Sequence, residues 1–153
     1  MEGAKEKLLV LEKEGVYVFH GSPELLEELE PRQSKDYDYN LKQMVNDGEP
    51  AVVATPFAEI AIFRAIISNK VKPEKGGHWS RFYNDDGKFG FETTPEVMEL
   101  AKKTRGYVYV FEKKDFERRN SIEWRTAKAI KPIMKFEVNF DDLPLDIKEV
   151  EHK

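Results

Sequence analysis

A histidine and a glycine stand between two different elements in the stretch Tyr17–Glu24, which reads YVFHGSPE. Its first three residues are typical of a buried strand, and its last three are typical of a helix start with Ser22 as the cap. At such a junction, free backbone N–H groups and the positive helix end can bind a polar ligand. Gly21 would let the ligand approach closely, because it has no side chain. The alternative is that His20 is an ordinary surface residue beside a helix cap.

A carboxylate and a guanidinium lie two residues apart in the stretch SIEWR, residues 121–125. In extended backbone, Glu123 and Arg125 share one face while Trp124 points to the other. One interpretation is a catalytic carboxylate held beside a cation. The other is a solvated ion pair, which would contribute about 0–1 kcal/mol. The residue types alone leave both interpretations open.

The composition restricts the class of protein. A chain of 153 residues, 40% of them hydrophobic, is long enough for one domain with a real core, and 35% charged residues indicate an ionised surface. The 25 Lys and Arg against 29 Asp and Glu give a net charge of −4. This acidic total argues against a dedicated nucleic-acid binder but leaves room for a local basic patch. With no cysteine and three histidines far apart, the sequence predicts no metal site.

Targeting signals are not evident in the sequence. The N-terminal run Leu8–Leu11 is too short, and its flanks too charged, for a signal peptide, and no segment approaches membrane-spanning length. We therefore expect a cytoplasmic protein without a membrane partner.

The pattern of apolar residues predicts an α+β fold in a single domain, residues 1–153. Each of three expected helices follows a Ser or Thr and then Pro, a cap-and-proline signature. Residues 32–50 are polar and are predicted to be mostly loop. The expected helices are 23–29, 57–68 and 95 to about 105, and the expected extended segments are 16–19, 51–54, 106–111, 122–125, 133–138 and 147–150.

The segment 69–93 is expected to be an insertion or a lid, with a hairpin turn at Asp86-Gly87. His78 and Trp79 lie in it and could cover a site. Residues 1–14 and 149–153 are expected at the periphery. The basic cluster formed by Lys113, Lys114, Arg118 and Arg119 alternates with acids and is interpreted as a solvated turn.

Three blocks in this order resemble the ADP-ribosyltransferase superfamily. They are the strand 17–22 ending in His-Gly-Ser, the strand and helix through residues 52–63, and the segment 123–133 that begins with Glu-Trp-Arg. The resemblance is to the poly(ADP-ribose) polymerase-like branch of the His-Tyr-Glu type, and to its small bacterial, phage or archaeal single-domain members. It implies the split β-sandwich of that superfamily, with short helices.

The same resemblance implies that NAD is a substrate and that Glu123 and His20 are catalytic. Glu123 would contact the nicotinamide ribose and stabilise its oxocarbenium-like transition state. His20 would bond a ribose hydroxyl, the Gly21 backbone would hold the carboxamide, and Phe63 would stack on nicotinamide. The implied nucleotide-binding set is His20, Gly21, Ser22, Thr55, Phe63 and Arg125.

Two positions depart from the family pattern, since Phe63 replaces the usual Tyr and Ile60 replaces a small polar residue. Two alternatives therefore stay open. One is a non-catalytic module that binds a nucleotide or a protein partner. The other is an enzyme like the RNA 2′-phosphotransferases, to which Arg32 and Arg125 would belong. The acceptor of ADP-ribose is not defined by the sequence: protein, nucleic acid, phosphate and water all fit.

Overall fold

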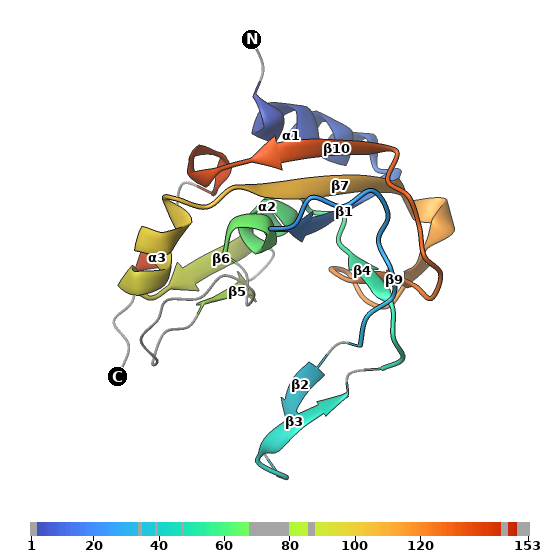
Figure 1. Cartoon of the computed structure of the whole chain (residues 1–153), viewed down its shortest axis with the longest axis horizontal. Helices are drawn as coiled ribbons and strands as arrows, with labels where there is room; N and C mark the ends of the chain where they lie inside the picture. The colour runs from blue at the N-terminus through green and yellow to red at the C-terminus, as the bar shows by residue number, and fades with distance from the viewer. Residues whose placement is uncertain are drawn as a thin grey trace.

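The computed structural model describes residues 3–33, 35–38, 40–46, 48–67, 80–85, 88–144 and 147–149. The fold is mixed α+β, as the sequence predicts (Figure 1). The helices are α1 (Ala4–Glu14), α2 (Ala58–Ile66) and α3 (Pro95–Ala101), with the 3₁₀ turns η1 (Lys113–Asp115) and η2 (Phe140–Asp142). The strands are β1 (Tyr17–Ser22), β2 (Lys35–Asp38), β3 (Gln43–Asn46), β4 (Val52–Ala54), β5 (Ser80–Asp85), β6 (Lys88–Thr93), β7 (Gly106–Glu112), β8 (Glu117–Arg118), β9 (Trp124–Thr126), β10 (Met134–Val138) and β11 (Lys148–Glu149).

Two antiparallel sheets meet at one pair of residues. The first sheet has the order β1-β7-β10 and the second has the order β4-β9-β8. Phe19 of β1 and Thr55, just after β4, exchange two backbone hydrogen bonds of 2.7 and 2.8 Å. In Figure 1, β4 and β9 therefore lie beside the end of the first sheet.

Helix α2 lies so close to the first sheet that two strand positions must be glycine. A Cβ on Gly21 would lie 1.8 Å from the carbonyl oxygen of Ala61, and one on Gly106 would lie 2.3 Å from that of Ala65. Alanines on the helix and glycines on the strands thus allow backbone-to-backbone packing. The structure gives Gly21 a packing role that the sequence analysis did not predict.

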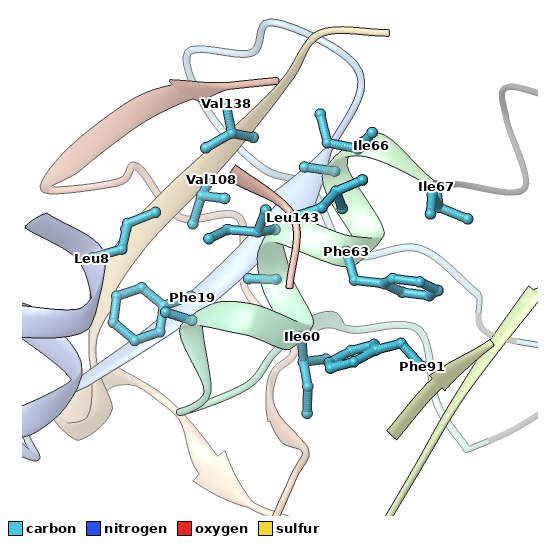
Figure 2. Close-up of a cluster of buried hydrophobic side chains, with 14 of the residues drawn as sticks. Leu8, Phe19, Ile60, Phe63, Ile66, Ile67, Phe91, Val108, Val138 and Leu143 are labelled. Atoms are coloured by element: carbon cyan, nitrogen blue, oxygen red, sulfur yellow. The ribbon is translucent and has the colours of Figure 1, made fainter. Parts of the chain in front are cut away.

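The core has two parts, one on each face of the first sheet. On the α2 face, Leu8 of α1 and Phe19 pack with the apolar residues of α2, and the rings of Phe63 and Phe91 lie together (Figure 2). On the opposite face, Val18 and Tyr109 are covered by residues of the second sheet and of the segment 23–32. Residues 4–14, which the sequence analysis places at the periphery, thus contribute a fully buried leucine.

Several sequence predictions are confirmed. Helix α3 begins with Pro95 after Thr94 at the N-cap position. Strands β5 and β6 form the predicted hairpin, with Asp85 opposite Lys88. The turn residues 86–87, together with His78 and Trp79, lie outside the described residues.

The longest helix among the described residues has 11 residues, and none of the described helices could span a bilayer.

The predicted helix over residues 23–29 is absent from this described segment, and the prediction is wrong. The buried hydroxyl of Tyr109 accepts a hydrogen bond from the Leu26 N–H at 2.6 Å and donates one to the Glu24 carbonyl at 2.7 Å. Leu29 exchanges two bonds of 2.9 Å with Ile130. These contacts engage backbone groups that a helix would use internally.

The predicted loop 32–50 contains the two-stranded hairpin β2–β3, which projects from the body of the molecule (Figure 1). Its turn is stabilised by Asp38, whose carboxylate accepts hydrogen bonds from the N–H groups of Asn40 and Leu41. These strands carry no alternation of apolar and polar residues by which they could be predicted, because a projecting hairpin has no face to bury.

Candidate functional site

Strands β1 and β4 separate immediately after they meet. Because Phe19 and Thr55 exchange both bonds, the next exchange in an antiparallel ladder would join Gly21 and Val53. Between these two described residues that exchange does not form. Instead, Nδ1 of His20 lies 2.6 Å from the Val53 carbonyl oxygen. The side chain of His20 thus replaces a ladder bond and occupies the gap between the strands.

A hollow of about 230 Å³ lies at this gap. His20, Gly21, Ser22, Arg32 and Val53 are among the residues that line it. The N–H and C=O of Gly21 point to the edge of β1 that faces away from β7, as those of Phe19 do. Among the residues that the structure describes, neither group has a hydrogen-bond partner. They present one donor and one acceptor side by side.

The contact with Val53 also sets the tautomer of His20. A carbonyl oxygen only accepts, so Nδ1 must carry the proton. In the neutral ring, Nε2 is then an acceptor. Such a nitrogen suits a hydroxyl donor on a ligand.

The segment 23–32 closes the hollow on one side. Tyr109 holds its first half through the two bonds to Glu24 and Leu26, and its second half pairs with Ile130 and with Ala51. Burial raises the pKa of Tyr109 above its ordinary value of 10.0. The hydroxyl is protonated at neutral pH even without that shift, so it can donate to the Glu24 carbonyl. We call this segment the strap.

Glu123 lies in a tight turn just before β9. The side-chain oxygen of Asn120 accepts hydrogen bonds from the N–H groups of Ile122 and Glu123, at 2.9 and 2.8 Å. The Glu123 carbonyl accepts in return from the N–H groups of Arg119 and Asn120. The position of Glu123 is therefore determined by backbone contacts on both sides.

The carboxylate of Glu123 is held through one oxygen only. Arg119 Nη1 and Arg125 Nε both donate to Oε2 at 2.8 Å. No residue in the described part of the chain bonds Oε1. The side chain is 20% exposed, against 13% for Arg125. This arrangement fixes the carboxylate through Oε2 and leaves Oε1 without a hydrogen bond to a described residue.

A third guanidinium acts on the same carboxylate. Burial lowers the pKa of Arg64 on α2, and the negative charge of Glu123 opposes that shift. Arg64, Arg119 and Arg125 thus come from three different parts of the chain. Together they bring positive charge to one carboxylate.

Most of the predicted site residues lie on or next to strands that pair side by side, with one exception. In the β4–β9 ladder Val53 lies opposite Arg125 and Ala54 lies opposite Trp124, so Thr55 and Glu123 each lie one residue beyond its last pair. Thr55 also bonds Phe19, so β4 lies between β1 and β9. Glu123 itself does not line the hollow beside His20.

Phe63 is the exception. It is 3% exposed, and its ring centroid lies 5.0 Å from that of Phe91 in the core (Figure 2). A ring covered to this degree offers no free face, so the stacking role expected of Phe63 does not fit the structure. The family resemblance cannot reveal this, because a core aromatic and a stacking aromatic look alike in sequence.

The expected capping roles are also corrected. Ser22 belongs to β1, and its hydroxyl accepts from the Glu24 N–H at 3.2 Å without starting a helix. Helix α2 begins at Ala58 with Phe57 at its N-cap position, so Thr55 is not the cap. The carboxylate of Glu12 on α1 caps the N-terminus of α2 instead, because it accepts a hydrogen bond from the Ala58 N–H at 2.6 Å.

Four residues that support the candidate site have no such role in the sequence analysis: Arg64, Tyr109, Arg119 and Asn120. The sequence places Arg119 in a solvated turn, whereas in the structure it bonds Glu123. The spacing of Asn120 before Glu123, typical of a side chain that caps a turn, could have indicated its role. Neither Arg64 nor Tyr109 carries a local signal, because their partners are distant in sequence.

Among the described residues, no group of three His, Asp or Glu side chains could hold a metal ion. The chain matches no protein-family model, no curated protein and no solved structure. The functional argument therefore depends on the geometry described above.

Proposed function

We propose that this protein is an NAD-dependent ADP-ribosyltransferase with the split β-sandwich of that superfamily. One observation carries the proposal: Glu123 is anchored through Oε2 by two arginines, while Oε1 bonds no described residue. Glu123 lies just before β9, which pairs with the strand β4 that borders the gap.

The gap suits the nicotinamide end of NAD. A carboxamide has one N–H donor group and one carbonyl acceptor, which complement the C=O and N–H of Gly21. The Nε2 acceptor of His20 suits a ribose hydroxyl. In this proposal the strap forms the outer wall, and the ring of nicotinamide is held by the hollow rather than by Phe63.

The reaction breaks the bond between C1′ of the ribose and the ring nitrogen of nicotinamide. The bonding electrons leave with nicotinamide, and positive charge develops on the ribose. In this proposal Glu123 Oε1 offsets that charge in a partly buried setting. An acceptor hydroxyl then forms the new bond to C1′ and releases its proton. Arg119 and Arg125 hold the carboxylate in one orientation throughout.

The three arginines around Glu123 favour a second candidate, transfer that begins from an RNA 2′-phosphate. There the guanidinium groups would bind the phosphate, as arginine does in planar two-bond contacts. NAD would remain the co-substrate, but Glu123 would act only as a partner that positions the arginines.

Release of nicotinamide from NAD distinguishes the candidates. It is measured with and without a 2′-phosphorylated RNA, for the native protein, Glu123→Gln and the control Glu14→Gln, which changes an exposed carboxylate at the end of α1. The proposal predicts release without RNA, a loss of about 100-fold or more in Glu123→Gln and native activity in the control. Release that requires the RNA and is insensitive to Glu123→Gln supports the second candidate. No release under either condition, together with no binding of NAD, would exclude both.

A further inference from the structure

The charge of this acidic chain is distributed unevenly. Residues 113–135 contain eight Lys and Arg but only three Asp and Glu, although the whole chain has a net charge of −4. This range comprises η1, β8, β9 and the start of β10, which lie together at one end of the molecule (Figure 1). We call this region the basic end.

Four cations of the basic end are exposed to solvent: Arg118, Lys128, Lys131 and Lys135. No carboxylate of the described residues lies within ion-pair distance of any of them. They come from a strand, a loop and a second strand, so they are spread over a surface and do not converge on one point. Such a spread suits a chain of phosphates better than a single anion.

An open groove of about 760 Å³ lies within the basic end. Lys114 and Lys128 line it together with the apolar residues Phe116 and Ile130. Glu49, Asp115 and Glu117 also line it, so the excess of positive charge lies around the groove and not inside it. A groove of mixed lining with two apolar side chains, bordered by cations, offers room for bases next to sites for phosphates.

An aromatic ring at the basic end is already in contact with a cation. Nζ of Lys113 lies 5.4 Å from the centroid of the Trp124 ring. Trp124 is half-buried and follows Glu123 directly. Arg118 is the residue opposite Trp124 in the β8–β9 ladder, so a second basic residue belongs to the same strand pair. Basic residues interleaved with an aromatic are typical of surfaces that bind single-stranded nucleic acid.

We propose that the basic end binds a single-stranded nucleic acid, which passes beside Glu123. The role of that strand as the acceptor of ADP-ribose rests on the proposed function, whereas its binding does not. An acidic protein segment is disfavoured because three carboxylates already line the groove. The strand would instead place its phosphates on the surrounding cations and its bases over the groove.

Fluorescence anisotropy with labelled single-stranded RNA and DNA tests this inference directly. The native protein is compared with Lys128→Glu/Lys131→Glu/Lys135→Glu and with the control Lys7→Glu/Lys13→Glu/Lys103→Glu. The control makes the same change of charge at exposed lysines outside the basic end. We expect native binding to weaken about 10- to 100-fold between about 50 and 200 mM salt. The first variant should bind at least about 10-fold more weakly than the native protein, and the control within about 3-fold.

Three results would overturn the inference: no binding by the native protein at low salt, equal losses in the two variants, or displacement of the strand by polyglutamate as readily as by unlabelled RNA. The last result would identify an acidic protein as the partner. A protein that binds RNA but releases no nicotinamide keeps this inference and loses the proposed function. The opposite pattern keeps the proposed function and overturns the inference.

Discussion

His20 donates a hydrogen bond from Nδ1 to the carbonyl oxygen of Val53 at 2.6 Å. In an unbroken ladder that carbonyl would accept from the Gly21 N–H. A side chain has therefore taken the place of a backbone donor, and the two strands separate around it. This separation of the strands produces the hollow and leaves the backbone groups of Gly21 without a partner among the described residues.

Substitution of His20 tests this relationship. His20→Ala should lower the free energy of unfolding by about 1–3 kcal/mol, because the Val53 carbonyl loses its partner. His20→Asn supplies an amide donor of similar reach and should recover most of that loss. Denaturant unfolding measures both variants. Equal stability of the Ala and Asn variants would show that the bond to Val53 contributes nothing.

The close packing of α2 predicts the effect of Gly21→Ala. The added methyl would overlap the Ala61 carbonyl, which is backbone and cannot move without displacing the helix. We expect a loss of at least about 1–3 kcal/mol in the free energy of unfolding. Gly3→Ala is the control, because its methyl would meet only the flexible side chain of Glu6. A Gly21→Ala variant as stable as this control would contradict the packing described.

The strap depends on one hydroxyl. Tyr109→Phe removes both of its hydrogen bonds and keeps the ring. It should lower the free energy of unfolding by about 1–3 kcal/mol and weaken the binding of any ligand in the hollow. Amide hydrogen exchange at Leu26 reports the change, since that N–H donates to the hydroxyl. Tyr107→Phe is the control two residues away on the same strand. Unchanged protection of Leu26 in Tyr109→Phe would show that the strap is held by other contacts.

Glu12 predicts a dependence of stability on pH. Burial raises its pKa in the folded protein above the ordinary value of 4.5. The folded state then binds the proton more tightly than the unfolded state, so this group's contribution to stability falls as pH rises from about 4.5 through the raised folded pKa.

Two variants of Glu12 separate this charge effect from the capping bond. Glu12→Gln keeps an oxygen for the Ala58 N–H and should remove that part of the pH dependence. Glu12→Ala removes the acceptor as well and should be less stable than Glu12→Gln by about 0.5–2 kcal/mol at any pH. Thermal unfolding from pH 4 to pH 8 is the measurement. A Gln variant with the native pH profile would assign the dependence to another group.

The sequence predicts the elements that have strong local patterns. The apolar strand Tyr107–Phe111 and the apolar helix after Thr55 lie close to where they were expected, because their patterns follow burial directly. The helix expected after Ser22 fails for a non-local reason, since a hydroxyl on β7 engages the backbone of that segment. A cap-and-proline signature depends on neighbouring residues only, so it carries no information about a hydroxyl that is distant in the sequence.

The candidate site is predicted only in part, for a similar reason. His20, Gly21, Glu123 and Arg125 stand out because they interrupt regular patterns, and the structure brings their strands together across two ladders. The stacking role predicted for Phe63 does not fit, because residue type does not distinguish a core ring from an exposed one. The roles of Arg64 and Tyr109 could be predicted only if it were known which elements pack against each other.

The central claim is that the backbone of Gly21 receives the carboxamide of NAD. Titration of the ¹⁵N-labelled protein with NAD, observed at the amide signal of Gly21, tests it most directly. We expect a large, saturable shift of the Gly21 signal that nicotinamide alone reproduces and that Glu14→Gln leaves unchanged. A Gly21 signal that stays fixed at millimolar NAD, whether or not other signals move, would contradict the account.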